Sequence, residues 1–129
     1  ANANVGAVVS FIGQVRDFND DKDIQSLTLE HYPGMTEKAL TAIACDAESR
    51  WNIIDSLIIH RVGTLKPLDQ IVLVAVTAAH RGEAFKACEF MMDFLKTNAP
   101  FWKKEETPTG AHWVDAKQTD DAAAISWKT

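Results

Sequence analysis

The residues best suited to chemistry are basic, and they cluster in one stretch of the sequence. Between Arg81 and Lys104 lie five Lys or Arg residues and three Asp or Glu residues, a local charge of +2 in a chain of net charge −5. Lys96 closes a predicted helix, and Lys103 follows a predicted turn at Pro100. If that turn folds back, both ammonium groups enter one pocket, where close cations lower each other's pKa and favour proton transfer near neutral pH. The alternative is that Lys96 only complements the dipole of its helix.

A second basic pair, His80-Arg81, follows a long apolar run and leads into the same predicted helix. Strand ends that open into helices are common ligand sites, and an arginine beside free helix N–H groups can hold an anion. The alternative is a pair of solvated loop residues. Arg16, at the end of the first predicted strand, is a further candidate for binding an anion.

Other motifs that carry chemistry are missing from the sequence. It has no GxGxxG, GxxxxGK[ST], HExxH or GxSxG pattern, and its four histidines lack metal-ligand spacing. Cys45 and Cys88 form no CxxC pair, and both are predicted on apolar helix faces as small buried hydrophobes. The sequence therefore predicts no metal, no cofactor and no catalytic thiol.

Length and composition predict one domain over residues 1–129. The chain is 47% apolar, which suits a domain that buries its own core. The net charge of −5 disfavours a nucleic-acid binder, because such a protein needs a basic surface. No apolar run approaches the ~20 residues of a membrane helix, and no secretory signal is visible. These features favour a soluble, cytoplasmic protein with no nucleic-acid or membrane partner.

Hydrophobic patterns place the candidate residues on a mixture of strands and helices. Strands are predicted at residues 5–15, 26–32, 56–62, 70–78 and 112–116, with a loop at 17–23, a turn at 63–69 and a polar tail. One helix begins at the N-cap Thr36 and carries its apolar stripe to Trp51, and a second covers residues 83–97. This order predicts an α+β fold, in which a mixed or mainly antiparallel sheet packs against helices. Residues 70–78 are apolar on both faces, so we expect them at the centre of the sheet.

Four runs of the sequence carry a resemblance to a known family. They are LTLEHYPGMTEKAL (27–40), IIHRVGTLKPLD (58–69), VAVTAAHRGEAF (74–85) and MDFLKTNAPFWKKE (92–105). From about residue 6 to residue 127 the chain resembles the large, catalytic subunit of molybdopterin synthase, the MoaE family. The resemblance implies an α/β-hammerhead-like fold. Family members usually carry an additional N-terminal segment, which we expect to be missing here.

The resemblance also implies an activity and its partners. The activity is sulfur transfer that converts cyclic pyranopterin monophosphate (precursor Z) into molybdopterin, in molybdenum cofactor biosynthesis. The family forms a homodimer that binds two small ubiquitin-like sulfur-carrier subunits, each ending in a Gly-Gly thiocarboxylate, to give a heterotetramer. Because the carrier brings the sulfur, the large subunit needs no cofactor or reactive cysteine. Lys96 and Lys103 match the two active-site lysines, which we expect to act as acid/base and electrostatic groups.

Binding residues follow from the same resemblance. His80 and Arg81 match residues that bind the pterin and its phosphate, and Arg16 matches a further basic residue of that pocket. Lys117 stands where the family often has Arg, in the segment that reaches the neighbouring protomer's site, and lysine cannot bind phosphate in the bidentate manner of arginine.

Two other functions compete with this enzyme. A non-catalytic dimer that only docks a ubiquitin-like partner would have no need to keep Lys96, Lys103, His80 and Arg81 together. A nucleic-acid binder that uses the basic stretch is disfavoured by the acidity of the chain and would show steep salt dependence.

Overall fold

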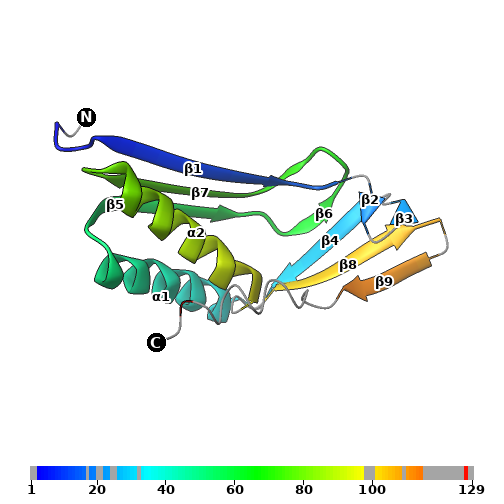
Figure 1. Cartoon of the computed structure of the whole chain (residues 1–129). Coiled ribbons are helices and arrows are strands. Elements are labelled where there is room, and N and C mark those ends of the chain that lie inside the picture. Colours follow the sequence, from blue (N-terminus) through cyan, green and yellow to red (C-terminus); the bar gives the residue numbers. More distant parts are fainter. Residues whose placement is uncertain are drawn as a thin grey trace.

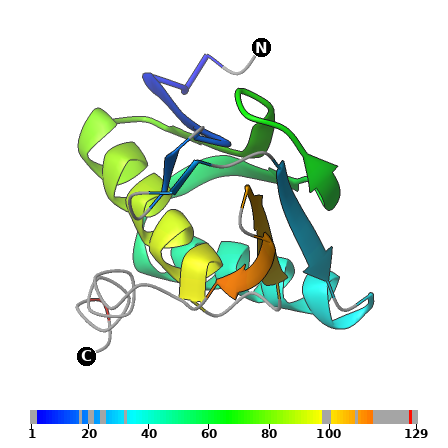
Figure 2. The ribbon, with the colours of Figure 1, turned by 90° about the vertical axis from the view of Figure 1, so that its right-hand side faces the viewer.

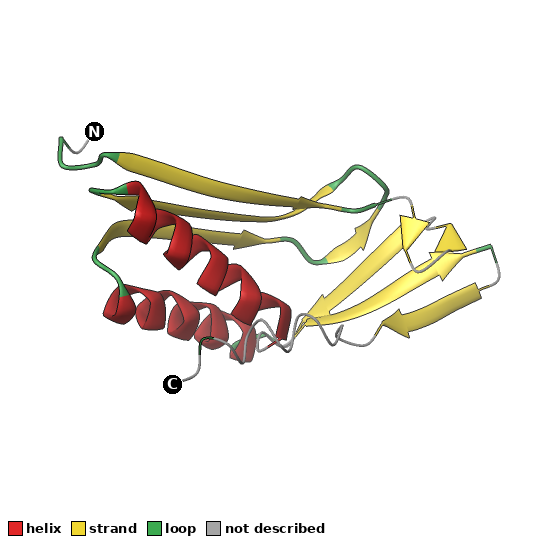
Figure 3. Ribbon diagram, in the orientation of Figure 1, coloured by secondary structure: helices red, strands yellow, loops and turns green. Residues whose placement is uncertain are grey.

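The computed structural model describes residues 3–16, 18–19, 22–23, 26–31, 33–97, 101–108, 110–114 and 127. Figures 1 and 3 show both helices on one side of a three-stranded sheet, with a four-stranded sheet beyond one end of it. The elements, in chain order, are β1 (Ala7–Gln14), β2 (Phe18–Asn19), β3 (Lys22–Asp23), β4 (Ser26–His31), α1 (Met35–Arg50), β5 (Ile53–His60), β6 (Gly63–Leu65), β7 (Gln70–Ala78), α2 (Arg81–Thr97), β8 (Phe101–Thr107) and β9 (Gly110–Val114).

The three-stranded sheet has β7 at its centre, in the order β1-β7-β5, and both pairings are antiparallel. Val72, Val74 and Val76 are buried in the core that the helices cover, and the residues between them are half-buried. α2 contributes Phe90 and Met91, which are 1% and 0% exposed, to the same core. The prediction that residues 70–78 form a central strand is therefore confirmed.

The opposite face of this sheet carries apolar side chains that the described part of the chain leaves exposed. The register aligns Val8 with Thr77, and it aligns both Ile12 and Ile59 with Leu73 of the central strand. Val8, Ile12 and Ile59 are 68%, 49% and 51% exposed. Single exposed apolar residues are ordinary, but apolar residues gathered on one face mark an interaction surface. We call this surface the outer sheet face.

The second sheet has the order β6-β4-β8-β9, again with antiparallel pairings throughout. Figure 2, which turns this end toward the viewer, shows it in front of the helices. Leu27 and Leu29 of β4 form a small core of their own with Val15 and Leu65. Two antiparallel sheets with a helical layer confirm the predicted α+β class.

Several short strands were not evident from local sequence patterns. Residues 63–65 form β6 where a turn is predicted, and residues 101–107 form β8 where no strand is predicted. The predicted loop at 17–23 contains the small hairpin of β2 and β3. β4 pairs with both β6 and β8, which lie far from it in sequence. Such pairing depends on cross-strand neighbours, which single-segment periodicity does not reveal.

Element ends differ from prediction by a few residues. β5 begins at Ile53 rather than at residue 56, and its pairing with β7 shifts register between Ile53 and Asp55. β9 begins two residues before the predicted 112. The prediction of Thr36 as N-cap is wrong, since Thr36 is buried inside α1. Gly34, at a φ of 83° that favours glycine, precedes the helix, and its N–H donates to Glu37 Oε2 at 2.5 Å.

The two cysteines differ in burial, so the prediction that both are buried is wrong for Cys45. Cys45 is exposed on α1, whereas Cys88 is buried on α2. Ile43 and Ala47 are buried on either side of Cys45. At about 100° per residue, Cys45 points to the opposite side of the helix. Burial raises the pKa of the Cys88 thiol, which disfavours the reactive thiolate there.

Gly6 is required where the chain enters β1. Its N–H donates to the Ala78 carbonyl at 3.0 Å, and a Cβ added at Gly6 would collide with the Ala79 carbonyl oxygen, beside His80. Gly6→Ala is expected to lower the free energy of unfolding by about 1–3 kcal/mol, because backbone must shift. Urea denaturation measures this change. Gly82→Ala is the control, since a Cβ there meets nothing within 4 Å and should change stability by less than about 1 kcal/mol. An equal loss in both variants would contradict the role of Gly6.

Candidate functional site

Lys96 lies on the last turn of α2 with its side chain exposed. Lys103 lies in β8, where its backbone pairs with Leu29 of β4 and Val114 of β9. No strand is predicted for this segment, and the turn predicted at Pro100 lies outside the described residues. The side chain of Lys103 is outside the described part of the chain, so the convergence of the two ammonium groups stays a prediction.

His80 and Arg81 lie at the other end of α2, and both are exposed. The helix begins at Arg81 rather than at the predicted residue 83, and the Ala84 N–H donates to the His80 carbonyl at 3.4 Å. Arg81 therefore stands in the first turn, where backbone N–H groups lack helical acceptors. An anion at this place would meet a guanidinium and the positive end of the helix dipole.

Arg16 is exposed just beyond β1, at the end of the three-stranded sheet opposite to His80. Its neighbour Val15 donates to the Asp69 carbonyl and accepts from the Leu68 N–H, both at 2.9 Å. These bonds hold Arg16 beside the start of β7, while His80 follows the end of that strand. Lys117 lies outside the described residues.

Within one chain, the structure separates His80 and Arg81 from both Lys96 and Arg16. From Arg81 to Lys96 the helix rises roughly 22 Å, at about 1.5 Å per residue. β7 separates the Arg16 end from the His80 end by roughly 26 Å. α2 runs back along the sheet, and its C-terminal end, on whose last turn Lys96 stands, lies toward the end where the four-stranded sheet begins (Figure 1). α2 therefore holds Arg81 and Lys96, which belong to the same basic stretch of the sequence, well apart.

The described residues contain no group of three or more His, Cys, Asp or Glu side chains that could hold a metal ion. None of their helices combines the length and the apolar character needed to cross a membrane. What the exposed groups offer is positive charge at both ends of α2, suited to anionic ligands and to proton transfer.

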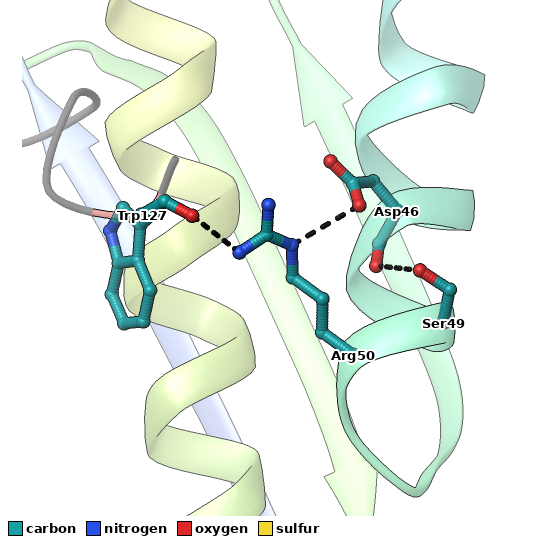
Figure 4. A network of polar contacts seen from close by, with 4 residues as sticks. All are labelled: Asp46, Ser49, Arg50 and Trp127. Carbon is teal, nitrogen blue, oxygen red and sulfur yellow. Dashed lines mark hydrogen bonds and ion pairs between the residues drawn. The ribbon is translucent and has the colours of Figure 1, made fainter. Parts of the chain in front are cut away.

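The docking of Trp127 on the helices was not predicted from the sequence, which indicates only a polar tail in this region. Trp127 lies against both helices, and its Nε1–H donates to Asp93 Oδ2 at 2.6 Å. Arg50 donates from Nη1 to the Trp127 carbonyl at 2.6 Å (Figure 4). A lone tryptophan within a polar, alanine-rich tail is the signal that could have indicated docking.

Comparison with known proteins gives consistent matches. A sequence-family model described as "MoaE protein" matches residues 1–98. The chain is 63% identical over 123 residues to the molybdopterin synthase catalytic subunit of Ralstonia nicotianae, covering 95% of this chain and 70% of that protein. A MoaE protein structure from Burkholderia ambifaria aligns with a TM-score of 0.82 at 58% identity, over 99% of this chain and 84% of that one. The molybdopterin synthase structure from Staphylococcus aureus aligns with a TM-score of 0.84 at 36% identity, over 89% and 84%.

Proposed function

The chain belongs to the MoaE family, and from this membership we propose that it is the catalytic subunit of a molybdopterin synthase. It is an enzyme of molybdenum cofactor biosynthesis, which converts cyclic pyranopterin monophosphate into molybdopterin. The observation that carries the proposal is the agreement, over nearly the whole chain, with a protein named for that activity. A cytoplasmic location and a single domain over residues 1–129 stay predictions from the sequence.

The chemistry needs a sulfur donor, and a small carrier subunit with a C-terminal thiocarboxylate fills that role in the proposal. In each of two transfers, the thiocarboxylate sulfur attacks a carbon of the pterin substrate and forms a C–S bond, while a C–O bond at that carbon breaks and its oxygen leaves as water or with the phosphate. Water then cleaves the acyl–sulfur bond, which leaves the sulfur on the product and returns the carrier as a carboxylate. The buried Cys88 supports an external donor, because its raised thiol pKa disfavours a sulfur-transfer role.

Lys96 and Lys103 act as the acid/base and electrostatic groups of this reaction. The exposed position of Lys96 at the end of a helix supports access to a substrate and to the tail of the carrier. An ammonium group there stabilises the negative charge that develops during sulfur attack and acyl hydrolysis. His80 and Arg81 bind the pterin and its phosphate, with Arg16 and Lys117 as further cations of the pocket.

A complete site then requires two copies of the chain. Lys96 and Arg81 belong to one pocket by family resemblance, yet the length of α2 separates them within a protomer. A two-fold dimer brings the two residues together, because Arg81 of each chain can lie beside Lys96 of the other chain. The exposed Val8, Ile12 and Ile59 of the outer sheet face support such a dimer, since they supply an apolar surface to bury. Two carriers on this dimer give the heterotetramer.

Reconstitution tests the function. The purified chain is mixed with thiocarboxylated carrier and precursor Z, and the dithiolene product is measured after its conversion to a fluorescent pterin derivative. Product in proportion to the carrier consumed is expected, and carrier with an ordinary carboxylate terminus is the control. A folded dimer that binds the carrier and yields no product would instead favour the alternative, a module that docks a ubiquitin-like partner without chemistry.

A further inference from the structure

Trp127 makes contacts through its ring, its indole N–H and its main chain. Its indole meets the rings of Trp51 and Phe90 edge-on, with centroids 5.4 and 5.7 Å apart. Its main chain is held as well, because Arg50 donates to its carbonyl while the guanidinium lies 4.7 Å from the Phe90 ring centroid. The aromatic ring of Trp127 is packed, its indole N–H donates a hydrogen bond, and its carbonyl accepts one.

Arg50 is itself held in place for this contact. Its Nε donates to Asp46 Oδ1 at 3.2 Å, four residues earlier on α1, and Figure 4 shows the guanidinium between Asp46 and Trp127. Trp51, the residue that ends α1, packs on both Trp127 and Phe90. The C-terminal end of α1 therefore forms a fixed platform for Trp127.

The indole N–H connects this platform to the last turns of α2. It donates to Asp93 Oδ2, and Asp93 also accepts at its main-chain oxygen from Thr97 Oγ1 at 3.1 Å. Lys96 lies between Asp93 and Thr97, three residues after the former. A helix end lacks partners for its last carbonyls and frays readily. Ties to the residues on both sides of Lys96 restrain that fraying.

We propose that Trp127 is a positioning residue for the sulfur-transfer reaction: it fastens Asp93 to the end of α1 and so holds the last turn of α2, with Lys96, in its working place. The inference rests on the proposed role of Lys96. We assign Trp127 no contact with the substrate. Its effect arises because a catalytic group must be held to within a fraction of an ångström, and small displacements lower the rate steeply.

The test compares three variants in the full reconstituted enzyme. Trp127→Phe keeps an aromatic ring and loses the N–H that binds Asp93. Asp93→Asn keeps an oxygen that can accept from the indole N–H, so this variant should retain most of the wild-type activity. Trp51→Phe is the matched control, because it makes the same change in the same aromatic cluster and leaves the Asp93 bond in place. For Trp127→Phe we expect kcat to fall about tenfold, with the KM for the pterin nearly unchanged.

A second measurement does not depend on activity. Amide hydrogen exchange reports the opening of the last turn of α2, and Trp127→Phe should speed exchange at residues 94–97 while Trp51→Phe should not. The inference is overturned if Trp127→Phe matches wild type in kcat and exchange. It is equally overturned if both tryptophan variants lose activity in step with their melting temperatures, since that indicates packing alone. An inactive wild-type enzyme would count against the proposed function instead, while the exchange result would still decide whether Trp127 holds this turn.

Discussion

Lys96→Ala is expected to lower kcat for dithiolene formation by about 100-fold or more, the range typical of losing a positioned acid/base group. The side chain is exposed at the end of α2 and contributes little to the core. We therefore expect the free energy of unfolding to change by less than about 0.5 kcal/mol. Single-turnover assays with saturating thiocarboxylated carrier measure the rate, and urea denaturation of the same samples measures stability.

Lys96→Arg separates two roles of this residue. Arginine keeps the positive charge but holds its proton at any accessible pH. If Lys96 transfers a proton, the arginine variant should be nearly as slow as the alanine variant. If Lys96 only stabilises negative charge, the arginine variant should recover most of the rate. A wild-type rate in Lys96→Ala would remove Lys96 from the mechanism and leave it the simpler role of complementing the helix dipole.

Two inactive variants are expected to restore activity when they are combined in one dimer. Lys96→Ala and Arg81→Ala homodimers should each be inactive, because every site lacks one group. A heterodimer of the two, purified through a different tag on each chain, should regain about half of wild-type activity. One site of this heterodimer then contains both substituted residues, and the other contains the wild-type Lys96 and Arg81. The reason is the span of α2, which prevents one chain from supplying both groups to a pocket.

The matched control combines Lys96→Ala with Lys103→Ala. In the proposed dimer, both lysines of a site come from the same chain. Every site in that heterodimer therefore lacks one lysine, and no recovery of activity is expected. The measurement is product formed per dimer under saturating substrate. Activity in the Lys96→Ala and Arg81→Ala heterodimer that stays at the level of its parent homodimers would show that one chain builds the whole site, and the two-copy arrangement would be wrong.

Local sequence patterns were sufficient for the longest elements. The strand at residues 70–78 and the helix that ends at Thr97 agree with the structure because side-chain periodicity is a local property. Cys45 is predicted to be buried and is exposed, although Ile43 and Ala47 on the same helix already indicate which face is buried. β6 and β8 were missed because strands of three and seven residues carry little periodic signal, and their partner β4 lies elsewhere in the chain.

The choice of candidate residues also came from the sequence alone. His80, Arg81 and Lys96 stand in specific motifs, and the family follows from those motifs without coordinates. Only the tertiary structure decided how these residues are distributed, because a helix keeps its ends apart however close they lie in sequence. It also decided that Trp127 returns to Arg50 and Asp93. Residue types and hydrophobic periodicity can be recognised within a short segment of the sequence. Distances between segments are fixed only when the sheets and helices pack together.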